Sequence, residues 1–207
     1  MEMRHIQIGR LETASVDPHP FEHVIVPSFI GPQTVHAVND TFPNIQSGGS
    51  HILKDYDSGA TISEVIAELD SPEFEEAIEN KFNISLSQYP KLYSLRAHTR
   101  AKDGRIHTDS KDKIITVLLY LNRDWPFASG RLRLLRSGTS LEDYVAEIPP
   151  DNGTLLAFKR SDASWHGHLS FVGPRRALQM NWVSDHRRSY WHVLRHTVSA
   201  VGKRIAG

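Results

Sequence analysis

Turns divide the second half of the chain into short apolar segments, and this pattern limits the folds open to it. From residue 92 onward, segments rich in β-branched, aromatic and leucine residues alternate with turns that contain glycine or proline. Segments of this length and spacing are typical of a β-sandwich or a closed β architecture. Eight of them fit a double-stranded β-helix, or jelly roll. The predicted strands are 92–99, 105–107, 114–122, 131–135, 144–148, 154–159, 167–171 and 176–183.

The sequence pattern before residue 92 predicts mainly helices, which would pack against this β core. Ser71 and Pro72 form an N-cap and a first-turn proline, and Glu73 follows where the helix dipole favours an acid. The segment 44–50 is rich in polar residues and glycine, and is either a substrate lid or a solvated connection. The predicted elements are an early strand within 21–30 that ends at Pro27, and helices at 31–42, 61–69 and 71–82.

These elements predict an α+β fold that is mainly β with flanking helices. A length of 207 residues suits one domain with a substantial core. The expected division is 1–91 for the N-terminal strand and helical support, 92–183 for the double-stranded β-helix core, and 184–207 for a C-terminal helix.

A histidine and an aspartate two residues apart mark a candidate metal site. On an extended segment, residues i and i+2 face the same side, so His107 and Asp109 can hold one ion. A second histidine follows more than fifty residues later, with His166 and His168 both available. Two histidines and one carboxylate form the facial triad that leaves open positions on Fe(II). The alternative is a polar turn at the end of a strand.

A candidate carboxylate site accompanies the metal motif. The segment 176–183 begins with an arginine, and an arginine there can hold a carboxylate through two parallel hydrogen bonds. Both Arg175 and Arg176 are available for this role. Tyr120 lies near the end of the apolar strand 114–122, and its hydroxyl is a second donor for the same carboxylate.

Several motifs in the same order resemble the Fe(II)/2-oxoglutarate-dependent oxygenases of the prolyl-4-hydroxylase type. The similarity is closest to the catalytic core of the hypoxia-factor prolyl hydroxylases and their bacterial relatives, and it covers about 92–182. The motifs are His107-Thr108-Asp109, the segment 119–125, the segment 130–134, and Trp165-His166 followed by Arg176.

The resemblance implies roles for individual residues. His166 is preferred to His168 because the family's ligand commonly follows an aromatic or small residue ahead of a glycine. Arg176 is preferred to Arg175 because Trp182 lies six residues beyond it, at the family's spacing and on the same strand face. The implied set is His107, Asp109 and His166 for iron, Arg176 with Tyr120 for the far carboxylate of 2-oxoglutarate, and Leu132 and Trp182 along the cosubstrate pocket.

The resemblance also implies an activity. Such an enzyme hydroxylates an unactivated C–H bond while it converts 2-oxoglutarate to succinate, with Fe(II) as cofactor and ascorbate as a candidate reductant. A prolyl residue of a peptide or protein is the nearest substrate class, and free amino acids or other small metabolites are the alternative. His98 stands where the family's prolyl hydroxylases have a tyrosine. Two other readings are a metal-binding, cupin-like isomerase or sugar-binding module, and a sensor with a degenerate site.

The charge balance limits the partners of the chain. The chain has 24 lysines and arginines against 24 acids, so a large field for nucleic acid is not expected. No apolar run is long enough to cross a bilayer.

The chain has no cysteine and starts without a secretory apolar segment, so we expect a cytoplasmic protein. The expected partners are O2 and a small-molecule or peptidyl substrate, and the basic segment 185–204 allows a dimer.

Four cationic side chains near the predicted pocket bear on the substrate. If they face the mouth of the pocket, they favour an anionic substrate; the alternative is that they are solvated strand residues paired with acids. They are Arg96, His98, Arg100 and Arg131.

Overall fold

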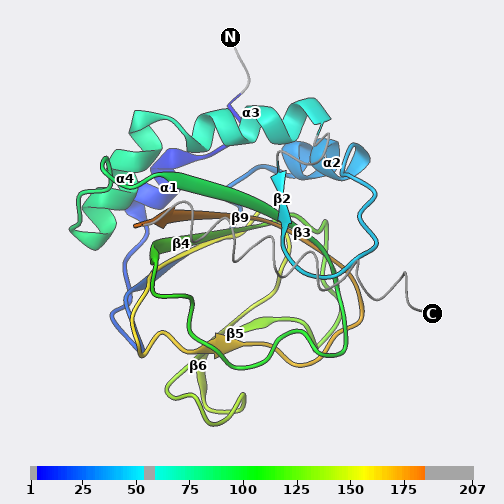
Figure 1. Cartoon of the computed structure of the whole chain (residues 1–207). Helices are drawn as coiled ribbons and strands as arrows, with labels where there is room; N and C mark the ends of the chain where they lie inside the picture. The colour runs from blue at the N-terminus through cyan, green and yellow to red at the C-terminus, as the bar shows by residue number, and fades with distance from the viewer. Residues whose placement is uncertain (1–3, 54–58, 185–207) are drawn as a thin grey trace.

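The chain folds into two antiparallel β-sheets that face each other, with helices covering the outer face of the larger sheet (Figure 1). The computed structural model describes residues 4–53 and 59–184. The helices are α1 (Ile8–Thr13), α2 (Pro32–Asp40), α3 (Gly59–Leu69) and α4 (Pro72–Phe82). The strands are β1 (His23–Val26), β2 (His51–Ile52), β3 (Lys91–Thr99), β4 (Lys113–Tyr120), β5 (Leu132–Leu135), β6 (Tyr144–Ile148), β7 (Leu155–Lys159), β8 (His166–Gly167) and β9 (Gly173–Val183).

The strand order is that of a jelly roll. The larger sheet runs β1-β7-β4-β9-β3-β2 and the smaller one β6-β5-β8. The longest strands, β3, β4 and β9, lie side by side in the middle of the larger sheet (Figure 1). The prediction of a mainly β fold with flanking helices is confirmed. Among the described helices, none is both long and apolar enough to cross a membrane.

The pleat of the central strands separates two cores. In β4, Ile115, Val117 and Leu119 belong to the core beneath the helices. Leu118 and Tyr120 of the same strand belong to the core between the two sheets. Successive side chains on a strand point to opposite faces, so the position of a residue along β4 or β9 decides whether it reaches the space between the sheets.

Helix α4 packs against β9 of the larger sheet. The Ser71 hydroxyl accepts a hydrogen bond from the backbone N–H of Phe74 at 3.2 Å, and Pro72 occupies the first turn, as predicted. The helix ends at Asn83, which adopts the left-handed conformation with φ 46°. The ring of Phe74 stacks on Trp182 of β9, with centroids 6.2 Å apart and planes 12° from parallel. This contact ties the helical layer to the sheet.

Two predicted strands were wrong or too long. Residues 105–107 form only an isolated bridge, between His107 and His166, and β8 contains two residues rather than 167–171. Each of these segments meets its neighbour over only a short length. Gly104 has φ +90° where the two segments meet, and a Cβ there would lie 2.5 Å from the His168 carbonyl oxygen.

The remaining differences lie in the first half of the chain and at its end. Helix α1 and strand β2 were not predicted. The loop 44–50 contains Gly48, which forms an isolated bridge with His98 of β3. The predicted C-terminal helix lies outside the described residues, and the division of the chain at residues 91 and 183 stays a prediction.

Replacing Phe74 by alanine should lower the free energy of unfolding by about 3–5 kcal/mol, because the ring is fully buried against Trp182. Urea denaturation followed by circular dichroism measures the loss. Phe127→Ala makes the same chemical change at a side chain that is 48% exposed, and should cost about 1 kcal/mol or less. Equal losses in the two variants would contradict this account of the core.

Candidate active site

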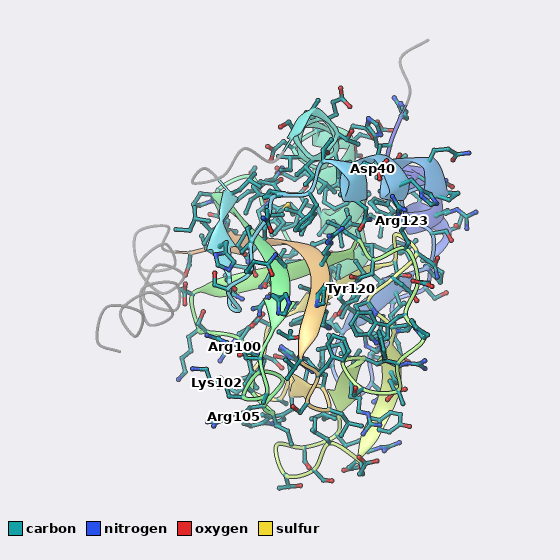
Figure 2. The ribbon with its side chains drawn as sticks, turned by 90° about the vertical axis from the view of Figure 1, so that its right-hand side faces the viewer. Asp40, Arg100, Lys102, Arg105, Tyr120 and Arg123 are labelled. Atoms are coloured by element: carbon teal, nitrogen blue, oxygen red, sulfur yellow. The ribbon has the colours of Figure 1, made fainter. Side chains whose placement is uncertain are left out.

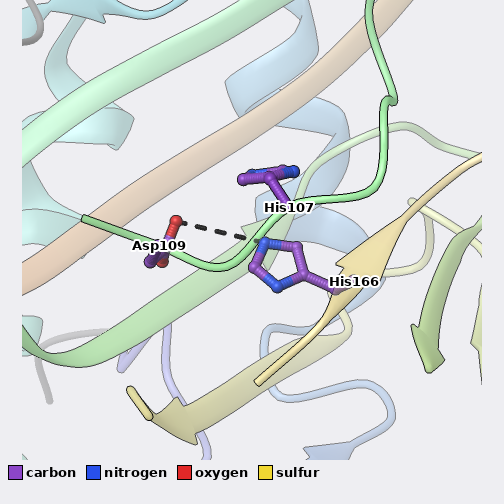
Figure 3. A group of neighbouring side chains, drawn as sticks. All are labelled: His107, Asp109 and His166. Atoms are coloured by element: carbon purple, nitrogen blue, oxygen red, sulfur yellow. Dashed lines mark ion pairs between the residues drawn. The ribbon is translucent and has the colours of Figure 1, made fainter. Parts of the chain in front are cut away.

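Three predicted ligands meet at one end of the space between the sheets (Figure 3). His107 and Asp109 lie on the segment between β3 and β4, and His166 begins β8. Each offers one ligand atom, and the three atoms lie within 4.8 Å of one another. The backbones of the two histidines exchange hydrogen bonds, His107 N–H to His166 O at 3.0 Å and His166 N–H to His107 O at 2.9 Å. This pairing fixes the two imidazoles side by side.

Hydrogen bonds also fix which nitrogen each histidine presents. The Nδ1 of His107 lies 2.8 Å from the carbonyl oxygen of Arg105, and the Nδ1 of His166 lies 2.9 Å from that of Ser164. A carbonyl only accepts hydrogen bonds, so each Nδ1 carries a proton, and in the neutral ring Nε2 is the nitrogen with the lone pair. Burial lowers the pKa of His166 to about 4, which keeps the ring neutral at physiological pH. Both imidazoles are therefore ready to bind a metal.

Asp109 is held as an ionised carboxylate. Burial acts to raise its pKa, but the charge of Lys113 and a hydrogen bond from Thr116 outweigh burial and hold the pKa below its usual range. The Lys113 Nζ lies 3.1 Å from Oδ1, and the Thr116 hydroxyl lies 2.5 Å from Oδ2. The same Oδ1 lies 4.0 Å from the Nε2 of His166, across the space where an ion would bind (Figure 3).

A cavity of about 320 Å³ opens beside the ligands. Tyr120 and Leu132, both predicted along the cosubstrate pocket, are among its lining residues. Part of its wall is apolar, formed by Leu118 of β4 and Phe158 of β7. This volume is at the lower end of the range for small-molecule sites. The cavity can therefore accept a compact cosubstrate next to the metal ligands.

The arginine in this cavity is Arg175, and the prediction of Arg176 is corrected. Arg175 is 5% exposed, its Nε donates to the carbonyl oxygen of Gly130 at 2.7 Å, and its guanidinium lies 5.4 Å from the centre of the Tyr120 ring. Arg176 points to the opposite face of β9, where its Nη1 donates to Asn39 Oδ1 at 2.6 Å. Its guanidinium also lies 5.0 Å from the centre of the Phe42 ring. Arg176 therefore ties β9 to α2.

Trp182 was predicted along the cosubstrate pocket, but it does not line the cavity, for the same reason as Arg176. It shares a face with Arg176, as predicted, but that face packs against the helices, and Trp182 lies in their core with Phe74. The side chains of β9 that line the cavity are Arg175 and Gln179. Tyr120 pairs with Ala177 in the sheet, and directly paired residues share a face. Arg175, two residues from Ala177, therefore faces the same side as Tyr120.

Two buried polar atoms in this cavity lack a partner. Within the described part of the chain, neither the Tyr120 hydroxyl nor the Nη2 of Arg175 has a hydrogen-bond partner. Burial raises the pKa of Tyr120, so its hydroxyl keeps its proton and can donate. Buried polar groups without partners are rare and costly. Two donors of this kind on one wall fit a carboxylate.

The other predicted neighbours divide between the cavity and its surroundings. His168 lines the cavity but is outside the ligand cluster, and burial lowers its pKa to about 4. Arg96 and Thr99 line the cavity, whereas His98 is not among its lining residues. Lys113 and Thr116, which hold Asp109, were not predicted. The short spacing from Asp109 to Lys113 is the one signal in the sequence that points to them.

Comparisons with known proteins agree with this geometry. Residues 84–184 match the model of the 2OG-Fe(II) oxygenase superfamily. No curated protein matches the chain significantly.

The fold is similar to that of solved prolyl hydroxylases. A prolyl-4-hydroxylase from Pseudomonas putida has a TM-score of 0.59 and 19% identity, over 85% of this chain and 96% of that one. A prolyl 4-hydroxylase from Phytophthora capsici has a TM-score of 0.60 and 17% identity, over 88% and 67%. A prolyl hydroxylase from Trichoplax adhaerens, solved with a hypoxia inducible factor peptide fragment, has a TM-score of 0.52 and 18% identity, over 88% and 90%.

The matched segment contains all three candidate metal ligands and both unpartnered donors. The resemblance seen in the sequence is therefore confirmed, and with it Fe(II) and 2-oxoglutarate as cofactor and cosubstrate. Residues 84–184 form a 2OG-Fe(II) oxygenase domain, and the chain is a 2-oxoglutarate- and Fe(II)-dependent dioxygenase whose fold is similar to that of prolyl 4-hydroxylases.

Proposed function

We propose that His107, Asp109 and His166 bind Fe(II), the two histidines through Nε2. The observation that carries this assignment is the meeting of three ligand atoms within 4.8 Å, with both Nδ1 atoms already bonded to carbonyl oxygens. Two imidazoles and one carboxylate are the donor set of non-haem Fe(II) oxygenases, and they leave open positions for other ligands. The residues present therefore fit the metal that the family requires.

Arg175 and Tyr120 are proposed to hold the far carboxylate of 2-oxoglutarate. Their unpartnered Nη2 and hydroxyl supply two donors on the wall of the cavity that contains the metal ligands. The bond from Arg175 to Gly130 orients the guanidinium before a ligand arrives. Leu132 lines the same cavity and would pack against the carbon chain of the cosubstrate.

With iron, 2-oxoglutarate and O2 bound, the site supplies the oxidative decarboxylation that yields succinate and CO2 and hydroxylates a C–H bond. The protein's part is to position these groups and keep water away. The carbonyl oxygens of Arg105 and Ser164 hold the histidine protons on Nδ1, and Lys113 keeps Asp109 ionised. The apolar side chains of Leu118 and Phe158 exclude water from the cavity wall.

The substrate class that we propose is an amino-acid residue, with a prolyl residue of a peptide or protein as the first candidate. The support is the likeness in fold to prolyl hydroxylases, one of which was solved with a peptide. A cupin-like module without oxidative activity would give Arg175 and Tyr120 no carboxylate to hold. An ascorbate requirement, a cytoplasmic location and a dimeric state stay predictions.

His166→Ala should weaken Fe(II) or Mn(II) binding by more than the roughly 10- to 100-fold that the loss of an outer partner of a ligand costs. His168→Ala, two residues away, should bind the metal nearly as well as the wild type, because His168 is outside the ligand cluster. Anaerobic isothermal titration calorimetry measures both affinities. If His168→Ala loses more metal affinity than His166→Ala, then His168 and not His166 is the metal ligand.

Arg175→Gln should weaken 2-oxoglutarate binding by about 30-fold to several thousand-fold, because it removes one partner of a buried charge pair. The measurement is an anaerobic titration of the Fe(II)-loaded protein, followed by the weak visible metal-to-ligand charge-transfer band. Arg176→Gln is the matched control, and it should leave the titration unchanged because Arg176 faces Asn39. If Arg176→Gln removes the band and Arg175→Gln does not, the assignment on β9 is wrong.

Tyr120→Phe should weaken 2-oxoglutarate binding by about tenfold, the expected effect of one hydrogen bond to a charged group. The wild-type and variant proteins are compared in the same anaerobic titration. Since the ring keeps its packing between the sheets, thermal unfolding should change little. Unchanged affinity would mean that the hydroxyl faces another ligand.

A further inference from the structure

A second arginine reaches the active-site cavity. Arg96 lies on β3 directly opposite Ala177 of β9, so it points to the inner face of the sheet between Arg175 and Gln179. It lines the same cavity as the metal ligands. Its Nε donates to Gln179 Oε1 at 3.0 Å. No other direct hydrogen bond or ion pair of Arg96 is found within residues 4–53 and 59–184.

The acids nearest to this guanidinium are committed elsewhere. Asp109 belongs to the metal site and pairs with Lys113 at 3.1 Å. Asp103 receives two hydrogen bonds from the Arg100 side chain, at 3.0 and 3.1 Å. Arg96 is partly buried, and a charge that is partly removed from water is costly unless an opposite charge pairs with it. The cost shows in the pKa of Arg96, which burial and the positive charge of Arg175 both lower.

The metal and cosubstrate do not remove this imbalance. The two charges of Fe(II) and the charge of Arg175 balance Asp109 and the two carboxylates of 2-oxoglutarate. Lys113, whose Nζ also lies 3.1 Å from Asp109, adds a further positive charge to this balance but does not line the cavity. The positive charge of Arg96 therefore lacks a paired anion among the described residues 4–53 and 59–184, the metal and the cosubstrate.

The mouth of the cavity has the same sign. Lys102 and Arg105 are exposed, line the cavity and form no ion pair in the described part of the chain. Figure 2 shows Arg100, Lys102 and Arg105 close together on the loop that follows β3. A cleft lined by one sign of charge raises the local concentration of ligands of the opposite sign. This arrangement favours the entry of an anion.

The other two cations considered in the sequence do not share this position. Arg131 pairs with Glu147 at 3.7 Å and donates to the carbonyl oxygen of Phe127. His98 does not line the cavity. Neither of these two side chains lines the cavity. The argument for an anionic substrate therefore rests on Arg96.

We propose that the substrate of this dioxygenase carries a carboxylate, and that Arg96 binds it beside the metal centre. The inference rests on the proposed function, since it needs the metal and 2-oxoglutarate in their assigned places. A guanidinium binds a carboxylate through two parallel hydrogen bonds, which fixes orientation as well as position. Such an anchor would set which C–H bond of the substrate faces the iron.

Acetate is a probe that needs no knowledge of the substrate. The Mn(II)-loaded protein with 2-oxoglutarate bound is titrated with ¹³C-labelled acetate, and the paramagnetic relaxation of the carboxylate carbon is measured. Acetate should relax strongly in the wild type, since Arg96 holds it near the metal. In Arg96→Gln its affinity should fall by about 10- to 100-fold. Arg176→Gln is the control, because it makes the same chemical change at an arginine that faces Asn39 on the other side of β9.

The same samples separate the possible failures. If wild-type protein does not bind 2-oxoglutarate, the proposed function fails before the inference is tested, and the inference falls with it. If 2-oxoglutarate binds but acetate does not relax, or relaxes equally in Arg96→Gln, the inference alone is overturned. If Arg96→Gln weakens 2-oxoglutarate as much as acetate, Arg96 belongs to the cosubstrate site and the inference is also overturned.

Matched acids and amides then identify the source of the carboxylate. L-Proline is compared with L-prolinamide, and acetyl-Pro-Glu-amide with acetyl-Pro-Gln-amide, by equilibrium binding to the protein loaded with Mn(II) and 2-oxoglutarate. In one pair the acid should bind at least about tenfold more tightly, and Arg96→Gln should remove the difference. A preference in the first pair indicates a free α-carboxylate, and one in the second an acidic side chain. Equal binding within both pairs would overturn the inference.

Discussion

The active site depends on the pair of backbone hydrogen bonds between His107 and His166. They join the segment before β4, in the larger sheet, to β8, in the smaller one. A third bond, from His168 N–H to the Gly104 carbonyl oxygen at 2.9 Å, continues the pairing, and glycine at position 104 lets the two backbones approach. Because backbone atoms bring the histidines together, the ligand geometry exists before any metal binds. Metal binding then requires little rearrangement of the protein.

The direction of side chains on β9 decides what surrounds the metal. Odd-numbered residues from Arg175 onward face the space between the sheets, and even-numbered ones face the helices. Two adjacent arginines therefore have unrelated roles, one in the cavity and one tied to Asn39 of α2. A shift of one residue in the pairing of β9 with β4 would exchange them. The stacking of Trp182 on Phe74 opposes such a shift, because it fixes the large side chain beneath α4.

The sequence pointed to the three candidate metal ligands that the structure brings together, because their signal is local and chemical. His107 and Asp109 are two residues apart, and an aromatic residue and a glycine flank His166. Helix α4 was predicted for the same reason, since its cap and its apolar stripe lie within a dozen residues. No local signal shows whether Arg175 or Arg176 faces the cavity. The orientation depends on which face of β9 meets the helices, and that is set by residues up to a hundred positions away, such as Phe74.

Two segments were predicted as longer strands than they form, and both lie where His107 and His166 pair. Residues 105–107 and 167–171 have strand-like composition but meet their neighbours only briefly, so β propensity has little pairing to act on. Irregular backbone there is what places Lys102, Arg105 and His107 around the mouth of the cavity. The rigid strands supply Arg96, Arg175 and Tyr120 from one side. A fixed wall of donors facing an irregular, basic rim is consistent with a site in which the cosubstrate is held by the sheet and the substrate enters past the loops.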